Sequence, residues 1–237
     1  MRKAACLVVF AIAPAVPFHA QFWKEKDFRK WSKAECEKML TDSPWAKYRP
    51  LTEVVLRPLM TGSLPSREGN PEIVYQARFL SALPIRQAIA QQERLGPRFA
   101  KLSSDEKKSV EEQEANWLNL DFGDEIVIQV TYRTNMPVLV KDLDRVWGSR
   151  PAQNWKLDTY LITAAGKIAP IDVLMPQGGG EFQLVFPRGV KGRPVLQPED
   201  KSVALEFVHP GTEVFPRERV FMEFKVQDMH VNGKLVY

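Results

Sequence analysis

The second half of the chain consists of short segments in which apolar and polar residues alternate. Ile126, Ile128, Val130 and Tyr132 share one side of such a segment, and a mostly polar set occupies the other, which is the two-residue period of a half-buried strand. Similar segments lie at 155–164, 167–174, 182–186, 203–208 and 220–226. Turn residues separate them, with no helix-length crossover of the kind that parallel strands require. The pattern therefore predicts an antiparallel β-sandwich.

Two helices are expected to interrupt the strand series. Extended runs at 52–60 and 72–82 come first, separated by a loop at 61–71 rich in glycine, serine and proline. Pro84 suits the first turn of a helix over 84–95, and the spacing of Ser103 and Glu106 predicts a capping box for a helix over 104–117. Residues 51–237 are thus expected to form one sandwich-like domain with a helical insertion at about 84–118.

Residues 21–50 differ from this domain because they are rich in lysine and hold three tryptophans. Ser32 and Glu35 again have the spacing of a capping box, and Pro44 limits the helix that starts there. This helix has a thin apolar face, so it needs Trp31 and Trp45 to dock on the main domain. The predicted class is α+β, mainly β: an antiparallel β-sandwich with inserted helices and an N-terminal helical arm.

The first twenty residues have the features of an export signal. Arg2 and Lys3 precede an apolar run at 4–16 that is too short to span a bilayer comfortably, and Ala20 precedes a polar residue. We expect residues 1–20 to be a signal peptide, whose removal leaves a periplasmic or secreted chain without a transmembrane span. Losing Arg2 and Lys3 lowers the formal net charge from +4 to +2. This near-neutral charge and the exported location argue against a nucleic-acid partner.

Few residues of the exported chain are typical of catalysis. Cys36 would be its single cysteine, which rules out an internal disulfide, and we expect the thiol to be buried. His209 and His230 are its two histidines, and neither lies in a zinc-binding or nucleophile motif. The glycines at 178–180 lack the lysine and the helix of a phosphate-binding loop, which favours a hairpin. We therefore predict no cofactor, no metal and no catalytic residue.

Neighbouring carboxylates lie at 124–125, at 142 and 144, and at 199–200. Glycoside cleavage uses two carboxyl groups about 5–10 Å apart, one of them desolvated. Adjacency along the chain does not produce that geometry. A carboxylate-dependent hydrolase acting on an envelope or extracellular polymer is the alternative function.

Aromatic residues suggest two binding surfaces, each with a structural alternative. Trp147 and Trp155 lie near a predicted loop and are the candidate partner-binding residues, although aromatics in strands usually belong to the core. The lysines and arginines of 24–33 alternate with aromatics, a mixture that suits peripheral contact with an anionic membrane or an anchored arm.

Two motifs carry a resemblance to known proteins. The segment Trp31-Ser32-x-x-Glu35, followed by Asp42-Ser43-Pro44-Trp45-Ala46-Lys47, resembles uncharacterised exported bacterial proteins of the kind seen among Acidobacteria. The stretches at 83–88 and 186–188 look similar as well. The resemblance implies secretion and a shared fold, and it transfers no catalytic residue because no activity is established for that group.

The sequence thus favours an exported cell-envelope protein that is a non-enzymatic binding or structural module. Its expected partner is another envelope protein or a polymer such as a glycan.

Overall fold

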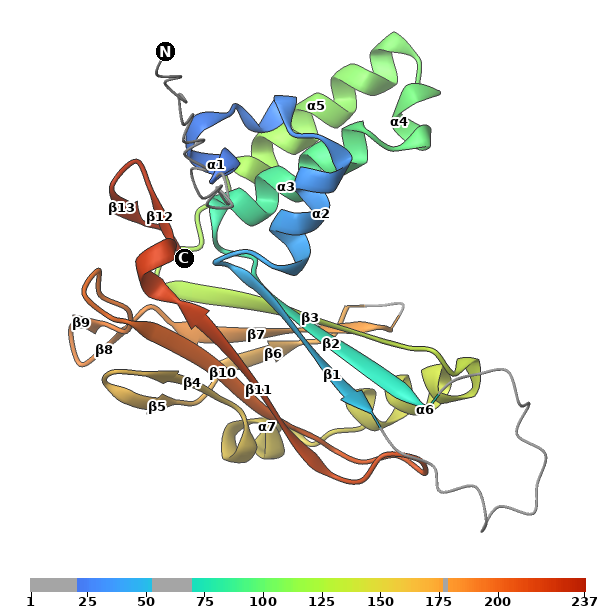
Figure 1. Ribbon diagram of the computed structural model, residues 1–237, viewed down its shortest axis with the longest axis vertical. Coiled ribbons are helices and arrows are strands. Elements are labelled where there is room, and N and C mark those ends of the chain that lie inside the picture. The colour runs from blue at the N-terminus through green and yellow to red at the C-terminus, as the bar shows by residue number, and fades with distance from the viewer. Residues whose placement is uncertain (1–20, 53–69, 177–178) are drawn as a thin grey trace, which may run out of the picture.

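The computed structural model describes residues 21–52, 70–176 and 179–237, and its main body is a pair of antiparallel sheets (Figure 1). The five-stranded sheet has the order β1 (Ala46–Thr52), β2 (Glu72–Phe79), β3 (Glu125–Thr134), β7 (Glu181–Pro187) and β6 (Asp172–Leu174). The four-stranded sheet has the order β11 (Glu218–Lys225), β10 (Ser202–His209), β4 (Tyr160–Thr163) and β5 (Gly166–Ile168). The α+β, sandwich-like class is confirmed.

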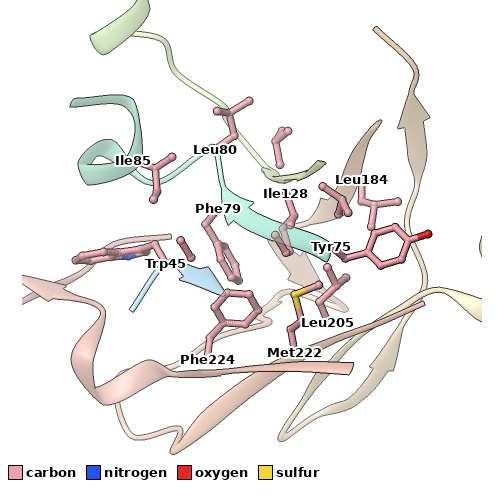
Figure 2. Packing of buried hydrophobic residues seen from close by; sticks show 14 of the residues in the cluster. Trp45, Tyr75, Phe79, Leu80, Ile85, Ile128, Leu184, Leu205, Met222 and Phe224 are labelled. Carbon is pink, nitrogen blue, oxygen red and sulfur yellow. The ribbon is translucent and has the colours of Figure 1, made fainter. Parts of the chain in front are cut away.

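The core lies between the two sheets, as Figure 2 shows. Ile126, Ile128, Val130 and Tyr132 of β3 are all buried, which confirms the face that the alternation predicts. Across the sandwich, the ring of Phe79 on β2 meets that of Phe224 on β11 edge-on, with centroids 5.0 Å apart. Such interdigitation of inner faces is what holds two sheets together.

Helices cover the sheets in two separate groups (Figure 1). The first group gathers above the sheets in the figure and comprises α1 (Phe22–Glu25), α2 (Lys33–Thr41), α3 (Leu83–Arg94), α4 (Pro97–Ala100) and α5 (Ser104–Leu118), with the 3-10 turn η1 (Phe28–Lys30). The second group lies apart from it and comprises α6 (Pro137–Gly148) and α7 (Ala152–Asp158). Small hairpins and a 3-10 turn complete the described chain: β8 (Gly189–Val190) with β9 (Arg193–Pro194), η3 (Val226–Asp228), and β12 (His230–Val231) with β13 (Lys234–Leu235).

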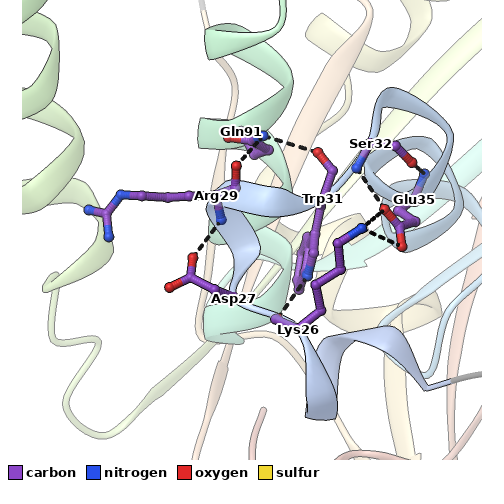
Figure 3. Close-up of polar contacts among 7 residues, drawn as sticks. All are labelled: Lys26, Asp27, Arg29, Trp31, Ser32, Glu35 and Gln91. Carbon is purple, nitrogen blue, oxygen red and sulfur yellow. Dashed lines mark hydrogen bonds and ion pairs between the residues drawn. The ribbon is translucent and has the colours of Figure 1, made fainter.

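The N-terminal arm is fixed by backbone contacts as well as by its aromatic residues (Figure 3). Gln91 of α3 donates to the carbonyls of Arg29 and Trp31, both at 3.0 Å. Trp31 in turn donates from its indole to the carbonyl of Lys26, and its ring is buried. Lys26 forms an ion pair with Glu35, the residue that also closes the capping box of α2. The arm is thus part of the folded body.

The cationic stretch at 24–33, which also suits contact with a membrane, places its aromatic rings inward. Phe22 and Trp31 are buried, and Trp23 and Phe28 are partly buried against the core. These rings therefore already have protein partners.

Several expected boundaries were wrong. Residues 46–50 do not belong to an outer arm, because β1 begins at Ala46 and pairs with β2. The strand predicted at 155–164 begins as helix α7 and becomes strand β4 only at Tyr160. The strand predicted at 167–174 is two strands in different sheets, β5 and β6, because Pro170 between them cannot donate to a ladder.

Helix α6 also contradicts the expectation of strand and turn throughout the second half. The predicted signal peptide at 1–20, most of the predicted strand at 52–60 and most of the predicted loop at 61–71 lie outside the described residues.

Candidate functional site

Trp147 and Trp155, the candidate partner-binding residues, lie inside the protein. Trp147 near the end of α6 exposes 1% of its surface, and Trp155 in α7 exposes 3%. Their rings stack with centroids 5.2 Å apart and planes at 25°. Phe182 of β7 contacts both, at centroid distances of 4.7 and 4.8 Å. Neither indole has an open face on which a sugar ring could stack.

The sequence of α6 explains why Trp147 is placed inward. Pro137 occupies the first turn, where its missing N–H costs no hydrogen bond. Leu139, Leu143 and Trp147 then follow at four-residue spacing and are all buried, so they form one face of the helix. The four-residue spacing of these residues is visible in the sequence, but the strand-like segments before and after it led to the expectation of strand and turn throughout this region.

A buried polar network lies beside this aromatic cluster. The indole N–H of Trp147 donates to the hydroxyl of Tyr75 at 3.2 Å, and that hydroxyl lies 2.7 Å from Nδ1 of His209. A hydroxyl that accepts from the indole keeps its own proton to donate, so we assign it as the donor to Nδ1. Nε2 of His209 then carries the ring proton and has no partner among the described residues.

Burial controls the protonation of this network. The pKa of His209 is lowered to about 4, mainly by desolvation and also by the positive charge of Arg150, while the negative charge of Asp142 opposes the shift. Desolvation also raises the pKa of Tyr75 far above its usual range. Both groups are therefore neutral at physiological pH.

Arg150 connects the aromatic cluster to the surface. Its guanidinium lies 4.8 Å from the ring centre of Trp155 and 5.4 Å from that of Trp147, which is a cation–π arrangement. The same group forms an ion pair with Asp158 and donates to the carbonyl of Val208. Asp158 also binds Arg217. These contacts leave Nε of Arg150 without a partner in the described part of the chain.

A hollow of about 270 Å³ opens above this cluster, between α7 and the edge strand β6. Ala152, Trp155 and Lys156 line the helix side. The strand side is lined by Ile171, Asp172, Val173 and Met175. Hereafter we call this hollow the α7–β6 groove. A second hollow of similar volume lies on the other side of Arg150, bounded by Asp158, Gly211 and Arg217.

The rim of the α7–β6 groove carries exposed apolar side chains. Ile171 exposes 49% of its surface and Met175 exposes 41%. Leu174 of β6 and Leu157 of α7 are exposed as well. Exposed apolar side chains gathered beside a hollow are typical of an interaction surface. Lys156 adds a surface cation that forms no ion pair within the described residues.

Three of the neighbouring carboxylates named in the sequence analysis are held by different partners. Asp142 binds Arg145, whereas Asp144 accepts from the hydroxyl of Tyr132 and from the backbone of Gly180. Asp200 accepts from the backbone of Gln197.

Other acids with little exposure are matched by cations. Glu206 binds Lys167 and Arg219, and Glu114 binds Arg94. Their carboxylates are therefore already engaged in ion pairs within the fold.

The glycine run is held in place by Asp144. Gly179 has a φ of 72°, and a Cβ built on it would lie 2.6 Å from the carboxylate of Asp144. Gly180 also has a positive φ, of 77°. Gly179 therefore lets the backbone pass close to the Asp144 carboxylate, where a residue with a Cβ would clash. Gly178 lies outside the described residues.

Two negative findings apply to the described ranges. No group of three or more His, Cys, Asp or Glu side chains there is placed to hold a metal ion. No helix there combines the length and apolarity needed to cross a bilayer.

Comparisons with protein-family models, with curated proteins and with solved structures gave no match for this chain.

The tryptophans under the groove were evident from the sequence, whereas the groove itself was not. Its open side is formed by Val173 of β6 and by Ile171 and Met175, which flank this strand. The partner of β6 was not evident from the sequence. Nor did any local signal point to the contact of Tyr75 with His209, residues 134 positions apart.

Proposed function

We propose that this protein is an exported cell-envelope binding module without a catalytic role, and that it binds a partner polypeptide in the α7–β6 groove. The observation that carries the proposal is the groove itself, with the exposed side chains of Ile171 and Met175 on its rim. Export rests on the cationic head and short apolar run of residues 1–20.

The chemistry of the groove supports a polypeptide partner over a glycan. Carbohydrate sites present aromatic faces, and here the faces of Trp147 and Trp155 are covered by each other, by Phe182 and by Arg150. A hollow of about 270 Å³ is also just below the range of about 300–1,000 Å³ that is usual for small-molecule sites. A side chain or a short stretch of a larger partner fits these dimensions.

The test is partner capture that depends on the groove. The exported chain carries a photo-crosslinking residue at position 157, beside the groove, and is compared with a variant that combines Ile171→Glu and Met175→Glu. Leu95→Glu is the matched control, because Leu95 is also an exposed apolar residue but lies at the end of α3. We expect a crosslinked envelope polypeptide with the wild type and with Leu95→Glu, and its loss with the double variant. Equal crosslinking by all three chains would contradict the proposal.

A further inference from the structure

The register of the five-stranded sheet determines which backbone groups of β6 face outward. The backbone N–H of Tyr132 donates to the carbonyl of Gly180, and the backbone N–H of Arg188 donates to the carbonyl of Asp124. Every second residue along β7 therefore directs its backbone N–H and carbonyl toward β3. The residues between them face β6, and the carbonyl of Val185 accordingly accepts from Ile171 at 2.8 Å.

In β6 the regular alternation starts at Asp172, because Ile171 donates to Val185 and the register also pairs Asp172 with Val185, so two successive residues here face one of β7. Asp172 lies opposite Val185 and Leu174 lies opposite Gln183, so these two residues turn their backbone groups toward β7. Val173 between them therefore directs its N–H and its carbonyl away from the sheet. No strand of the described residues pairs with this side of β6. Because Val173 also lines the α7–β6 groove, this open edge of the sheet faces that groove.

The outward N–H of Val173 is occupied by a side chain. Oδ1 of Asp172 accepts from it at 2.8 Å, which is a normal hydrogen-bond length. An open strand edge invites pairing with other chains, and a charged residue on the edge is one way in which proteins prevent it. Asp172 is exposed and forms no ion pair among the described residues, so it can leave this position freely.

We propose that β6 accepts an extended polypeptide segment as a sixth strand of the sheet, and that Asp172 guards this edge until the segment replaces it at the N–H of Val173. This inference rests on the proposed function, because it names how the partner is bound in the same groove. Main-chain hydrogen bonds supply affinity in this mode, and alternate side chains supply specificity.

The groove also indicates the chemistry of the segment. Ile171 and Met175 on the rim select apolar side chains at alternate positions of the added strand. Lys156 on the opposite wall selects a carboxylate. A second copy of this chain is a poorer occupant, because pairing two β6 edges would bring Lys156 of both copies toward one interface, where like charges repel.

The probe is a fluorescent, acetylated peptide of about ten residues with alternating valine and threonine and glutamates at one end. A second probe has the same sequence with alternate amides N-methylated, which removes pairing donors but keeps the side chains. Fluorescence anisotropy measures the binding of both probes to the exported chain. We expect the N-methylated peptide to bind at least about tenfold more weakly, as expected for a backbone hydrogen bond that is lost.

Three variants test the edge from the protein side. Val173→Pro removes the outward N–H and leaves the ladder with β7 intact, so it should weaken binding about tenfold. Asp172→Ala frees that N–H and should tighten binding about threefold, whereas Asp172→Asn keeps an acceptor and measures the effect of charge alone. Asp200→Ala is the matched control, since Asp200 also accepts from a backbone N–H but lies away from the groove.

Each outcome decides the inference. Equal binding of the two peptides to the wild type would overturn it, and so would unchanged binding by a folded Val173→Pro chain. Because the main chain carries the pairing, no binding of the unmodified peptide up to about 1 mM would overturn it as well. If crosslinking depends on Ile171 and Met175 but N-methylation has no effect, strand addition fails and the proposed function stands. If the Ile171→Glu and Met175→Glu substitutions leave crosslinking unchanged, the proposed function itself fails.

Discussion

At the scale of single residues, His209 links the stability of the protein to pH. Its pKa is lowered to about 4 in the folded chain, against about 6.5 in an unfolded chain. Between these values the unfolded state binds the proton and the folded state does not, so acid favours unfolding. This contribution to the free energy of unfolding is fully present above pH 6.5 and falls by about 3 kcal/mol as the pH drops to 4.

The measurement is urea unfolding at several pH values between 4 and 7. His209→Gln should remove most of this slope, even if the variant is less stable at pH 7. His230→Gln, which changes the other histidine of residues 21–237, is the control and should keep the slope. An identical slope for the wild type and His209→Gln would show that another group controls the acid response.

The burial of Trp147 and Trp155 changes what their substitution should do. Trp147→Ala would open a cavity under the groove and remove the donor to Tyr75, so we expect a loss of about 3–5 kcal/mol of stability. Trp147→Phe keeps much of the volume and should cost less. Chemical unfolding measures both. A nearly unchanged midpoint for Trp147→Ala would mean that this indole is not part of the core.

At the scale of elements, the arm depends on one side chain of α3. Gln91 donates to two carbonyls of the arm, and replacing it with leucine would leave both carbonyls without that donor. We expect Gln91→Leu to cost about 1–3 kcal/mol and to speed amide hydrogen exchange in residues 22–32. Gln92→Leu is the matched control, because Gln92 is the next residue of the same helix and is exposed. Equal exchange rates in the two variants would exclude this role of Gln91.

Elements with local signals were predictable, whereas those set by distant pairing were not. The alternation along Ile126–Tyr132 and the capping boxes at Ser32 and Ser103 depend only on near neighbours, and all three are confirmed. The edge position of β6 depends on its register with β7, which the sequence does not encode locally. For the same reason the α7–β6 groove could not be predicted from the sequence, which pointed only to Trp155 beneath it.

At the scale of the whole molecule, export should leave a chain that begins close to Gln21. The cationic head, the short apolar run and the small residue at Ala20 motivate this prediction. Mass spectrometry of the protein from fractionated cells should find the new N-terminus in the periplasm or the medium. Recovery of intact Met1 from the soluble cytoplasm would contradict it.

The same start point should be the minimal one for folding. Trp31, Met39, Leu40 and Trp45 belong to the same buried cluster as the facing sheets, and the indole of Trp45 donates to the carbonyl of Val236 near the other end of the chain. In addition, the side chains of Gln76 and Arg78 on β2 both donate to the carbonyl of Leu40.

A chain that begins at Ala46 would therefore expose apolar surface on one side of the core. It would also lose these three hydrogen bonds and the two that Gln91 donates to the arm. We expect a chain that begins at Gln21 to unfold in a single cooperative transition. We expect the chain that begins at Ala46 to lack near-ultraviolet circular dichroism and such a transition, since the sheets alone do not close the core. If the shorter chain keeps the same spectrum and the same melting temperature, the N-terminal segment is a dispensable arm rather than part of the domain.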